Sequence, residues 1–300
     1  MTILLTGKNG QLGYELYHKL QSKYKVIALG RDNVDFCNSH ALKEIIQHLP
    51  YLSLIVNIAA YTHVDQAEDE PTIVERVNVE APAILAAEAA RRDIPIIHFS
   101  TSYVFDGQID KPYIETDLTY PLSIYGRSKL ASEKRILELS EKHLLFRLSS
   151  LYDMRCRNFF TAMLRNLYLG ETPTVVSDQI IAPNWTPMIT DAVEHAIRIV
   201  LSGKNPNWGI YHLSSSGSTS CYEFSNTIFR IISERYSIRM PEIIPVTSEE
   251  FAAKAIRPSY SLLDTTKFQR DFNYQFTDWL DQLQHCINHW PSIPKTSKKE

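Results

Sequence analysis

Glycine is scarce in this sequence, at 10 of 300 residues, whereas about 7% is usual. Positive φ angles and close backbone approaches, which glycine permits most easily, are therefore confined to a few places. Three of the ten nevertheless cluster at Gly7, Gly10 and Gly13. In a glycine-poor chain, such a cluster indicates a place where structure or function requires a backbone conformation or a close approach that other residues do not allow.

Cysteine is also rare, and its spacing excludes two classes of site. The four cysteines are far apart and form no C-x-x-C pair, which argues against a zinc site or a disulfide framework: Cys37, Cys156, Cys221 and Cys286. A reducing cytoplasm fits this usage best. His285, Cys286 and His289 lie near one face of an expected helix, but no second cluster completes a coordination shell, and we expect no metal.

Long apolar runs and an excess of basic charge are both missing. The longest early run, residues 3–5, is too short for a signal peptide, and no stretch of 18 or more apolar residues predicts a membrane-spanning helix. Lysine and arginine number 31 against 34 acidic residues, without a basic stripe, so nucleic acid is not an expected partner. With 44% apolar residues, the composition is that of an ordinary globular protein.

The first half of the chain alternates short apolar runs with longer helical patterns. This alternation predicts β-α-β units and a Rossmann-type, doubly wound parallel sheet, an α/β fold. The expected strands are residues 2–6, 25–29, 52–57, 95–100 and 144–148, and the expected helices are residues 11–23, 39–48, 71–92 and 123–142.

The second half has a looser pattern, which indicates a smaller C-terminal α/β substrate lobe. Its expected helices are residues 159–169, 190–201, 221–236 and 277–289, with short strands at 174–176 and 210–213. We therefore expect a dinucleotide-binding domain at residues 1–150, a mainly substrate-binding lobe at 151–290, and a disordered tail at 291–300.

The glycine cluster lies between the first expected strand and the first expected helix. A helix N-terminus offers free N–H groups to a pyrophosphate if no Cβ blocks the approach. Gly7 would make the turn, Gly10 would let the backbone meet the phosphate, and Gly13 would let the helix pack on the strand. The spacing G-x-x-G-x-x-G differs from the common G-x-G-x-x-G by one residue, and a tight turn without a ligand is the alternative.

The second expected strand ends at Gly30, which Arg31 and Asp32 follow. An NAD site usually has an acidic residue there for the ribose 2'-hydroxyl, whereas an arginine accommodates the 2'-phosphate of NADP. Arg31 therefore favours NADPH, with NADH left open because Asp32 lies close by. The alternative is that Arg31 is a solvated loop charge.

Tyr125 and Lys129 form a Y-x-x-x-K pair that a helix places on one face. They follow the fourth expected strand, whose end carries Thr101, and ligands of open α/β sheets bind at the carboxyl ends of strands. Reduction of a carbonyl needs a proton donor, and a neighbouring ammonium lowers the pKa of a tyrosine. The three residues therefore predict a ketoreductase site, against the alternatives of a surface helix pair and a plain strand-end hydroxyl.

Several segments in order along the chain carry a family resemblance. They are the glycine run, NIAAYTHVD at 57–65, STSYVFDG at 100–107, PLSIYGRSK at 121–129, and the pairs at 257–258 and 263–264. Together they resemble the dTDP-4-dehydrorhamnose reductase family of extended short-chain dehydrogenases/reductases. The resemblance implies hydride transfer from NADPH or NADH to C4 of a dTDP-linked 4-keto-6-deoxysugar, with dTDP-L-rhamnose the expected product.

The resemblance also implies roles for individual residues. Catalysis would use Tyr125 as proton donor, with Lys129 and Thr101. The cofactor would contact Gly7, Gly10, Gln11, Leu12, Gly13, Arg31, Asp35, Phe36, Ala59, Ala60, Tyr61 and Lys129. The substrate would contact Thr101, Ser102, Tyr125, Ser150 and Arg257.

The sequence departs from the family pattern where the substrate is expected. Ser102 replaces the aspartate of S-T-D-Y-V-F, and Ser150 stands where R-T-S-W-V-Y has its tryptophan. Ile181 replaces a glycine of the family pattern. Trp185, which follows shortly after, is a candidate to supply the aromatic surface for the substrate in place of the missing tryptophan. The altered substrate side leaves open a different nucleotide sugar or a different stereochemistry at C4.

Two further implications concern partners. Some family members bind magnesium at a dimer interface; Glu15 matches one acidic ligand, but Pro187 falls where another aligns, so no metal is predicted. A homodimer is a candidate assembly. The alternative to an enzyme is a non-catalytic regulatory subunit, because the methionine adenosyltransferase β subunit is similar in fold and motifs.

Overall fold

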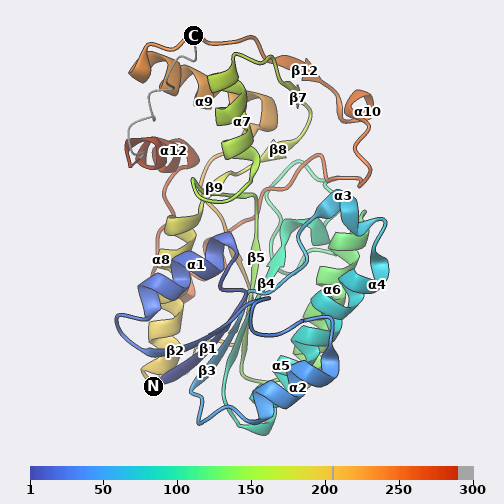
Figure 1. Ribbon diagram of the computed structural model, residues 1–300, viewed down its shortest axis with the longest axis vertical. Helices are drawn as coiled ribbons and strands as arrows, with labels where there is room; N and C mark the ends of the chain where they lie inside the picture. The colour runs from blue at the N-terminus through green and yellow to red at the C-terminus, as the bar shows by residue number, and fades with distance from the viewer. Residues whose placement is uncertain (205, 290–300) are drawn as a thin grey trace.

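The computed structural model describes residues 1–204 and 206–289, and its centre is a six-stranded parallel sheet (Figure 1). The strands lie in the order β10-β5-β4-β3-β1-β2, and every neighbouring pair is parallel. They span Thr2–Thr6 (β1), Lys25–Leu29 (β2), Leu54–Asn57 (β3), Ile96–Thr101 (β4), His143–Leu148 (β5) and Gly209–Leu213 (β10). The predicted doubly wound α/β fold is confirmed.

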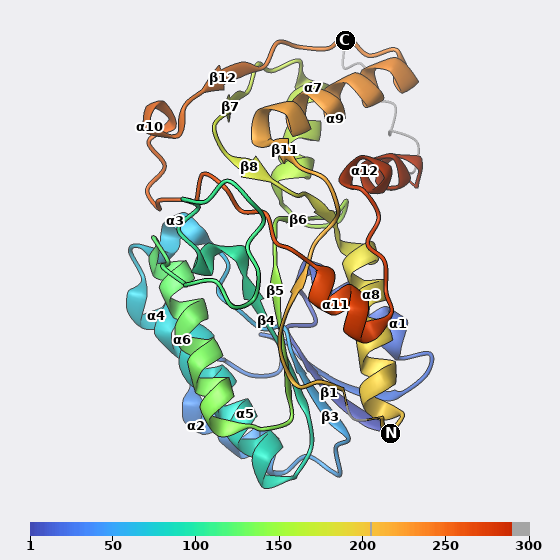
Figure 2. The same ribbon diagram turned by 180° about the vertical axis from the view of Figure 1, so that it is seen from behind.

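Helices cover both faces of the sheet, because successive side chains of a strand point to opposite faces (Figures 1 and 2). Ile3 and Leu5 belong to one buried apolar cluster, and Leu4 belongs to the other. The first cluster includes side chains of α1 (Gln11–Leu20), α8 (Thr186–Leu201) and α11 (Thr266–Phe272); the second includes those of α2 (Ser39–Gln47), α5 (Ala81–Arg91) and α6 (Ile124–Leu139). Both faces are therefore buried, as a parallel sheet requires.

The long helix expected at residues 71–92 is interrupted. The structure has α4 (Pro71–Glu75), then one turn of π-helix (Arg76–Glu80), then α5. Pro82 has no N–H to donate to the carbonyl of Asn78, which removes one bond of the α-helical ladder at this point. The widened turn contains Asn78, whose side chain accepts from Tyr61 N at 2.7 Å and donates to Ser128 Oγ at 2.9 Å. The interruption thus links the loop after β3 to α6.

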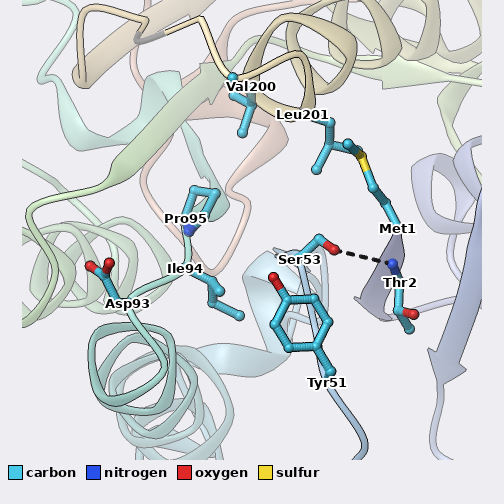
Figure 3. A pocket seen from close by; sticks show the side chains of 10 residues that line it. Met1, Thr2, Tyr51, Ser53, Asp93, Ile94, Pro95, Val200 and Leu201 are labelled. Atoms are coloured by element: carbon cyan, nitrogen blue, oxygen red, sulfur yellow. Dashed lines mark hydrogen bonds between the residues drawn. The ribbon is translucent and has the colours of Figure 1, made fainter.

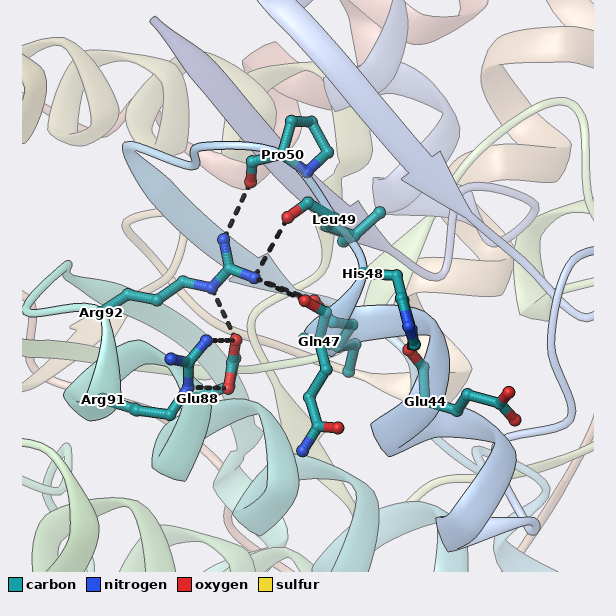
Figure 4. A network of polar contacts seen from close by, with 9 residues as sticks. Glu44, Gln47, His48, Leu49, Pro50, Glu88, Arg91 and Arg92 are labelled. Atoms are coloured by element: carbon teal, nitrogen blue, oxygen red, sulfur yellow. Dashed lines mark hydrogen bonds and ion pairs between the residues drawn. The ribbon is translucent and has the colours of Figure 1, made fainter.

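Arg92, the residue after α5, joins that helix to the end of α2 and the loop after it (Figure 4). Arg92 donates from its guanidinium to the carbonyl oxygens of Ile46 (3.1 Å), Leu49 (3.2 Å) and Pro50 (2.8 Å). Its Nε also donates to Glu88 at 2.6 Å. Leu49 and Pro50 lie in the loop after α2, and the Ile46 carbonyl also accepts from Leu49 N at 3.2 Å, so the guanidinium joins α5 to the end of α2 and to the loop that follows it.

The second half of the chain forms a separate apolar core around α7 (Phe159–Leu169), α9 (Cys221–Tyr236) and α12 (Trp279–Asn288). Three two-stranded ladders accompany these helices: β6 (Leu151–Tyr152) with β9 (Asn184–Trp185), β7 (Thr174–Val176) with β12 (Ile244–Val246), and β8 (Ile180–Ile181) with β11 (Thr219–Ser220). The Cys286 side chain is fully buried in this core. The expected smaller α/β lobe is thus present.

Three elements beyond residue 150 return to the sheet. Helix α8 packs beside α1, β10 pairs with β5, and α11 lies next to β10. The expected helix at 190–201 also begins earlier, at Thr186. A boundary at residue 150 therefore does not separate the sheet layer from the lobe, and the expected tail at 291–300 lies outside the described residues. Among those described, no helix is long and apolar enough to cross a membrane.

Candidate active site

The glycine cluster forms the turn from β1 to α1. Gly7 has φ +77°, and a Cβ there would lie 2.7 Å from the backbone nitrogen of Ala59. A Cβ on Gly13 would collide with the carbonyl of Gly7, whereas one on Gly10 would meet nothing nearer than 3.5 Å. Gly7 and Gly13 thus allow tight packing, and Gly10 begins α1 without a side-chain cap. The open helix N-terminus fits the pyrophosphate of a dinucleotide.

The end of β2 lies against this loop. Lys8 from the glycine turn forms an ion pair with Asp32 at 2.8 Å, and Arg31 lies between Gly30 and that aspartate in the chain. The ion pair lowers the pKa of Asp32 through its hydrogen bond to Lys8. Two basic residues therefore flank the strand end where the adenosine ribose of a dinucleotide belongs.

Of the other expected cofactor residues, Gln11 and the buried Leu12 open α1, and the rest lie in the segments that follow β2 and β3. Phe36 is buried against the sheet, and Asp35 accepts a hydrogen bond from Cys37 N at 2.9 Å. Ala59 N donates to Thr6 Oγ1 at 3.3 Å, which holds the segment 59–61 next to the glycine turn. The hydroxyl of Tyr61 donates to Glu70 at 2.7 Å.

Thr101 and Tyr125 meet at the carboxyl end of β4. Thr101 is the last residue of that strand, and Tyr125 lies in the first turn of α6, where the Ser123 side chain accepts from Gly126 N at 3.1 Å. The Thr101 hydroxyl accepts from Tyr103 N at 3.2 Å, and its side chain is close enough to Tyr125 to act on the pKa of that phenol. Burial raises the pKa of Tyr125 to about 12, and Thr101 opposes that rise.

Lys129 lies one helical turn beyond Tyr125 and is 3% exposed. Its Nζ lies 3.4 Å from Nε2 of His98 on β4. Burial lowers the pKa of Lys129 to about 8, which Glu133 partly opposes. We expected Lys129 to lower the pKa of Tyr125; in the structure burial dominates and the pKa of Tyr125 is raised.

A cavity of about 620 Å³ lies between the sheet layer and the lobe. Of the expected substrate residues, Ser150 and Arg257 line it, whereas Ser102 is 2% exposed and Thr101 8%. Ile181 lines it too. Other lining residues are mainly apolar or aromatic: Tyr103, Leu151, Tyr152, Phe159, Met163, Val175, Val176, Pro183, Phe224, Phe251, Ala253, Ala255 and Ile256.

The aromatic surface of this cavity does not come from Trp185. That side chain is buried in the lobe core, and its backbone N–H donates to Gln282 at 3.0 Å. Phe159 and Phe224, with stacked rings 6.0 Å apart, line the cavity instead. The sequence does not single out these two residues, because both occupy apolar positions in helices with the periodicity of a buried face.

Arg257 is the basic side chain among the cavity-lining residues that the structure describes. Its Nη2 donates to Asp65 at 2.6 Å, and its Nη1 donates to the carbonyl oxygen of Ala255 at 3.2 Å. The Asp65 carboxylate raises the pKa of Arg257 despite burial, so the guanidinium is charged. The cavity thus combines an apolar wall with the Arg257 guanidinium, which is paired with Asp65, and the acidic side chain of Glu249.

A second cavity, of about 490 Å³, opens at the amino ends of the strands (Figure 3). Met1, Thr2, Ser53, Ile94 and Pro95 contribute to its wall. Thr2 N donates to Ser53 Oγ at 3.3 Å across this wall, and Asp93 accepts from Lys142 Nζ at 2.7 Å. This cavity lies at the opposite end of the sheet from Thr101, Tyr125 and Lys129.

No metal centre accompanies the site within residues 1–204 and 206–289: no group of three or more His, Cys, Asp or Glu side chains is arranged to hold an ion there. Glu15 instead lies 3.4 Å from Arg155, and burial and Asp153 raise the pKa of its carboxyl.

A doubly wound sheet with a glycine turn before its first helix, and a strand-end threonine beside the tyrosine of Y-x-x-x-K, defines the class of short-chain dehydrogenases/reductases. The family model described as RmlD substrate binding domain matches residues 1–291, and the chain belongs to this family.

Relatives and solved structures agree with this assignment. The dTDP-4-dehydrorhamnose reductase of Escherichia coli K12 is 36% identical over 293 residues, covering 96% of this chain and 97% of that protein. A probable dTDP-4,6-dihydroxy-2-methyloxan-3-one 4-ketoreductase of Streptomyces antibioticus is 33% identical over 292 residues, covering 96% and 95%. The crystal structure of the Bacillus anthracis dTDP-4-dehydrorhamnose reductase in complex with NADP has a TM-score of 0.88 at 30% identity, covering 96% of this chain and 99% of that one.

Proposed function

We propose that this protein is a dTDP-4-dehydrorhamnose reductase that uses NADPH to reduce the C4 keto group of dTDP-4-dehydrorhamnose to dTDP-L-rhamnose. The observation that carries the proposal is the grouping of Thr101 and Tyr125, with Lys129 one turn away, at the carboxyl edge of the sheet. Family membership and the near full-length reductase relatives support it.

The glycine turn and the ends of β2 and β3 would hold the cofactor. Backbone N–H groups at Gly10 and the start of α1 bind the pyrophosphate, and Arg31 with Lys8 binds the 2'-phosphate. NADPH, when bound, supplies the hydride for C4. NADH is an alternative donor, because the exposed Asp32 follows Arg31 and an acidic side chain at this position can bind the ribose 2'-hydroxyl of NAD.

Tyr125 is the proton donor to the carbonyl oxygen of the sugar. A pKa raised to about 12 keeps the phenol protonated at neutral pH, and the Thr101 hydroxyl can hold the same oxygen in place. Negative charge develops on that oxygen as C4 is reduced, so the proton from Tyr125 completes the alcohol. The ammonium of Lys129 stabilises the resulting phenolate.

The cavity beside these groups would take the nucleotide sugar. Arg257 supplies a charge for the diphosphate, and the stacked pair Phe159 and Phe224 supplies an apolar surface for the base.

Four unpaired cysteines agree with a cytoplasmic location. The homodimer also remains a proposal, which sedimentation equilibrium would test.

A second candidate is a 4-ketoreductase for another nucleotide sugar. It is favoured by Ser102 and Ser150, which replace an aspartate and a tryptophan of the family pattern, and by the Streptomyces relative. Oxidation of NADPH against 4-keto sugars linked to dTDP, GDP, CDP and UDP would separate the two candidates, with NMR of the product to give the configuration at C4. No turnover of any 4-keto sugar would refute both.

A further inference from the structure

A chain of buried hydrogen bonds runs beneath Lys129 and starts at the glycine turn. Thr6 Oγ1 accepts from Ala59 N at 3.3 Å and donates to Asn57 Oδ1 at 2.5 Å. This orients the amide of Asn57 so that Nδ2 points at Nδ1 of His98, 2.9 Å away. Because Nδ2 is a donor, Nδ1 of His98 must accept, and the ring hydrogen belongs on Nε2.

The other end of the chain leads to the same assignment. Ser132 Oγ donates its single hydrogen to the carbonyl oxygen of Lys129 at 2.8 Å. It therefore accepts from Nε2 of His98, at 3.1 Å. His98 and Ser132 are fully buried, so no solvent offers an alternative partner.

The opposite tautomer would cost hydrogen bonds at both ends. Asn57 would have to turn its oxygen toward His98, and its Nδ2 would then leave the Thr6 hydroxyl without an acceptor. Nε2 and Ser132 Oγ would also face each other as two acceptors unless the serine released the carbonyl of Lys129. A buried donor or acceptor left unpaired costs about 1–3 kcal/mol, so the Nε2–H tautomer is selected.

Lys129 Nζ lies 3.4 Å from the nitrogen that carries this hydrogen. An N–H group cannot accept from an ammonium, so the contact offers Lys129 no acceptor on the sheet side. We propose that His98, held as the neutral Nε2–H tautomer, is a positioning residue that turns the hydrogen bonds of Lys129 away from the sheet, toward Tyr125 and the cofactor. The proposal deepens the function proposed above and rests on the role given there to Lys129.

Charges around the pair agree with this arrangement. Burial, and then the charge of Lys129, hold the pKa of His98 well below its ordinary 6.5. Glu133, the acidic group that acts on Lys129, forms a buried ion pair with Arg147 at 2.7 Å. Glu133 on α6 and His98 on β4 are the ionisable groups with a described electrostatic interaction with Lys129, and Arg147 on β5 pairs with Glu133. The other elements packed on α6 carry Asp65 on α3, Glu75 on α4, Arg76 and Glu80 in the π-turn, Glu88 and Arg91 on α5, and Tyr103 in the turn Ser102–Val104.

The affinity for NADH as a function of pH tests the proposal without any sugar substrate. NADH is the ligand of choice because it lacks the 2'-phosphate of NADPH, which itself titrates with a pKa of about 6. In the wild type, binding measured by nicotinamide fluorescence between about pH 6 and pH 10 should weaken as Lys129 loses its charge near pH 8. In His98→Gln, an amide oxygen can accept from the ammonium, so the midpoint should rise by about one pH unit.

His212→Gln is the matched control. His212 on β10 is also fully buried, and burial lowers its pKa, but its Nδ1 faces the carbonyl of Tyr113 and not Lys129. This variant should keep the wild-type midpoint. An unchanged midpoint in His98→Gln, or a wild-type affinity independent of pH, would overturn the proposal.

The tautomer itself can be read in the intact protein if His98→Gln fails to fold. Nitrogen chemical shifts of ¹⁵N-labelled histidine should show His98 protonated at Nε2, unprotonated at Nδ1 and constant through neutral pH. A signal with the hydrogen on Nδ1, or one that titrates near 6.5, would overturn the proposal. Absence of ketoreductase activity with this signal intact would refute the proposed function alone.

Discussion

Lys8 and Asp32 form an ion pair of 2.8 Å that joins the glycine turn to the end of β2. The two residues are far apart in sequence, and the pair places Lys8 near Arg31, which precedes Asp32 in the chain. Both cations are then close to the place where NADP differs from NAD. The preference for one cofactor is therefore expected to depend on exposed charges that substitutions can change without disturbing the core.

Arg31→Ala should weaken the binding of NADPH more than that of NADH. A charge-assisted hydrogen bond to phosphate contributes about 1.5–3 kcal/mol, which corresponds to about 10-fold to 100-fold in the dissociation constant. Titration of both cofactors by fluorescence would measure the ratio. Equal losses for the two cofactors would remove Arg31 from the 2'-phosphate site.

Tyr125→Phe should lower kcat by at least about 100-fold while the dissociation constant of NADPH stays nearly unchanged, because general acid catalysis contributes about that much. Only the phenolic oxygen is lost, and the ring still packs edge to face on Tyr103, at 6.1 Å between centroids. Steady-state turnover with the accepted 4-keto sugar, beside a cofactor titration, would test this. Near-normal turnover would exclude Tyr125 as the acid.

Arg257→Ala should raise KM for the nucleotide sugar by about 10-fold to 100-fold, because one charged contact to the diphosphate is lost. The affinity for NADPH should not change, since Arg257 lines the cavity and not the glycine turn. Arg230→Ala, at an exposed ion pair with Glu234, is the control for loss of a surface charge. A fall in NADPH affinity in Arg257→Ala would contradict the assignment.

Arg92→Ala should lower the free energy of unfolding by about 1–3 kcal/mol, because carbonyls at the end of α2 and in the loop after it lose the guanidinium as a donor. Urea denaturation would measure the loss. Arg135→Ala is the matched control: its ion pair with Glu138 is exposed, so the change should stay below about 1 kcal/mol. Equal effects of the two variants would mean that the carbonyl contacts do not stabilise the fold.

Local patterns in the sequence predicted the strands and several helices well. Residues 2–6, 25–29, 159–169 and 221–236 have the expected bounds, because apolar periodicity and capping residues are local signals. The π-turn at 76–80 was not predicted, although Pro82 was a visible cause. The return of β10 to the sheet could not be predicted, because a short apolar strand carries no information about its distant partner.

The candidate site shows the same division. Motifs placed Thr101, Tyr125 and Lys129 together, since spacing on a helix and position at a strand end are readable in sequence. The contact between Lys129 and His98 depends on how α6 lies across β4, which is tertiary. Trp185 was wrongly expected to face the substrate, because an aromatic side chain has the same pattern in a core and in a cavity wall.

The return of α8 and β10 to the sheet constrains the order in which the chain can fold during synthesis. One face of the sheet has only α1 on it until residues up to Leu201 have left the ribosome, since α8 packs on that face beside α1. The edge strand next to β5 is made later still. The nucleotide-binding half therefore cannot complete its core as an independent unit, and a nascent chain stopped near residue 150 would expose apolar sheet surface that chaperones bind.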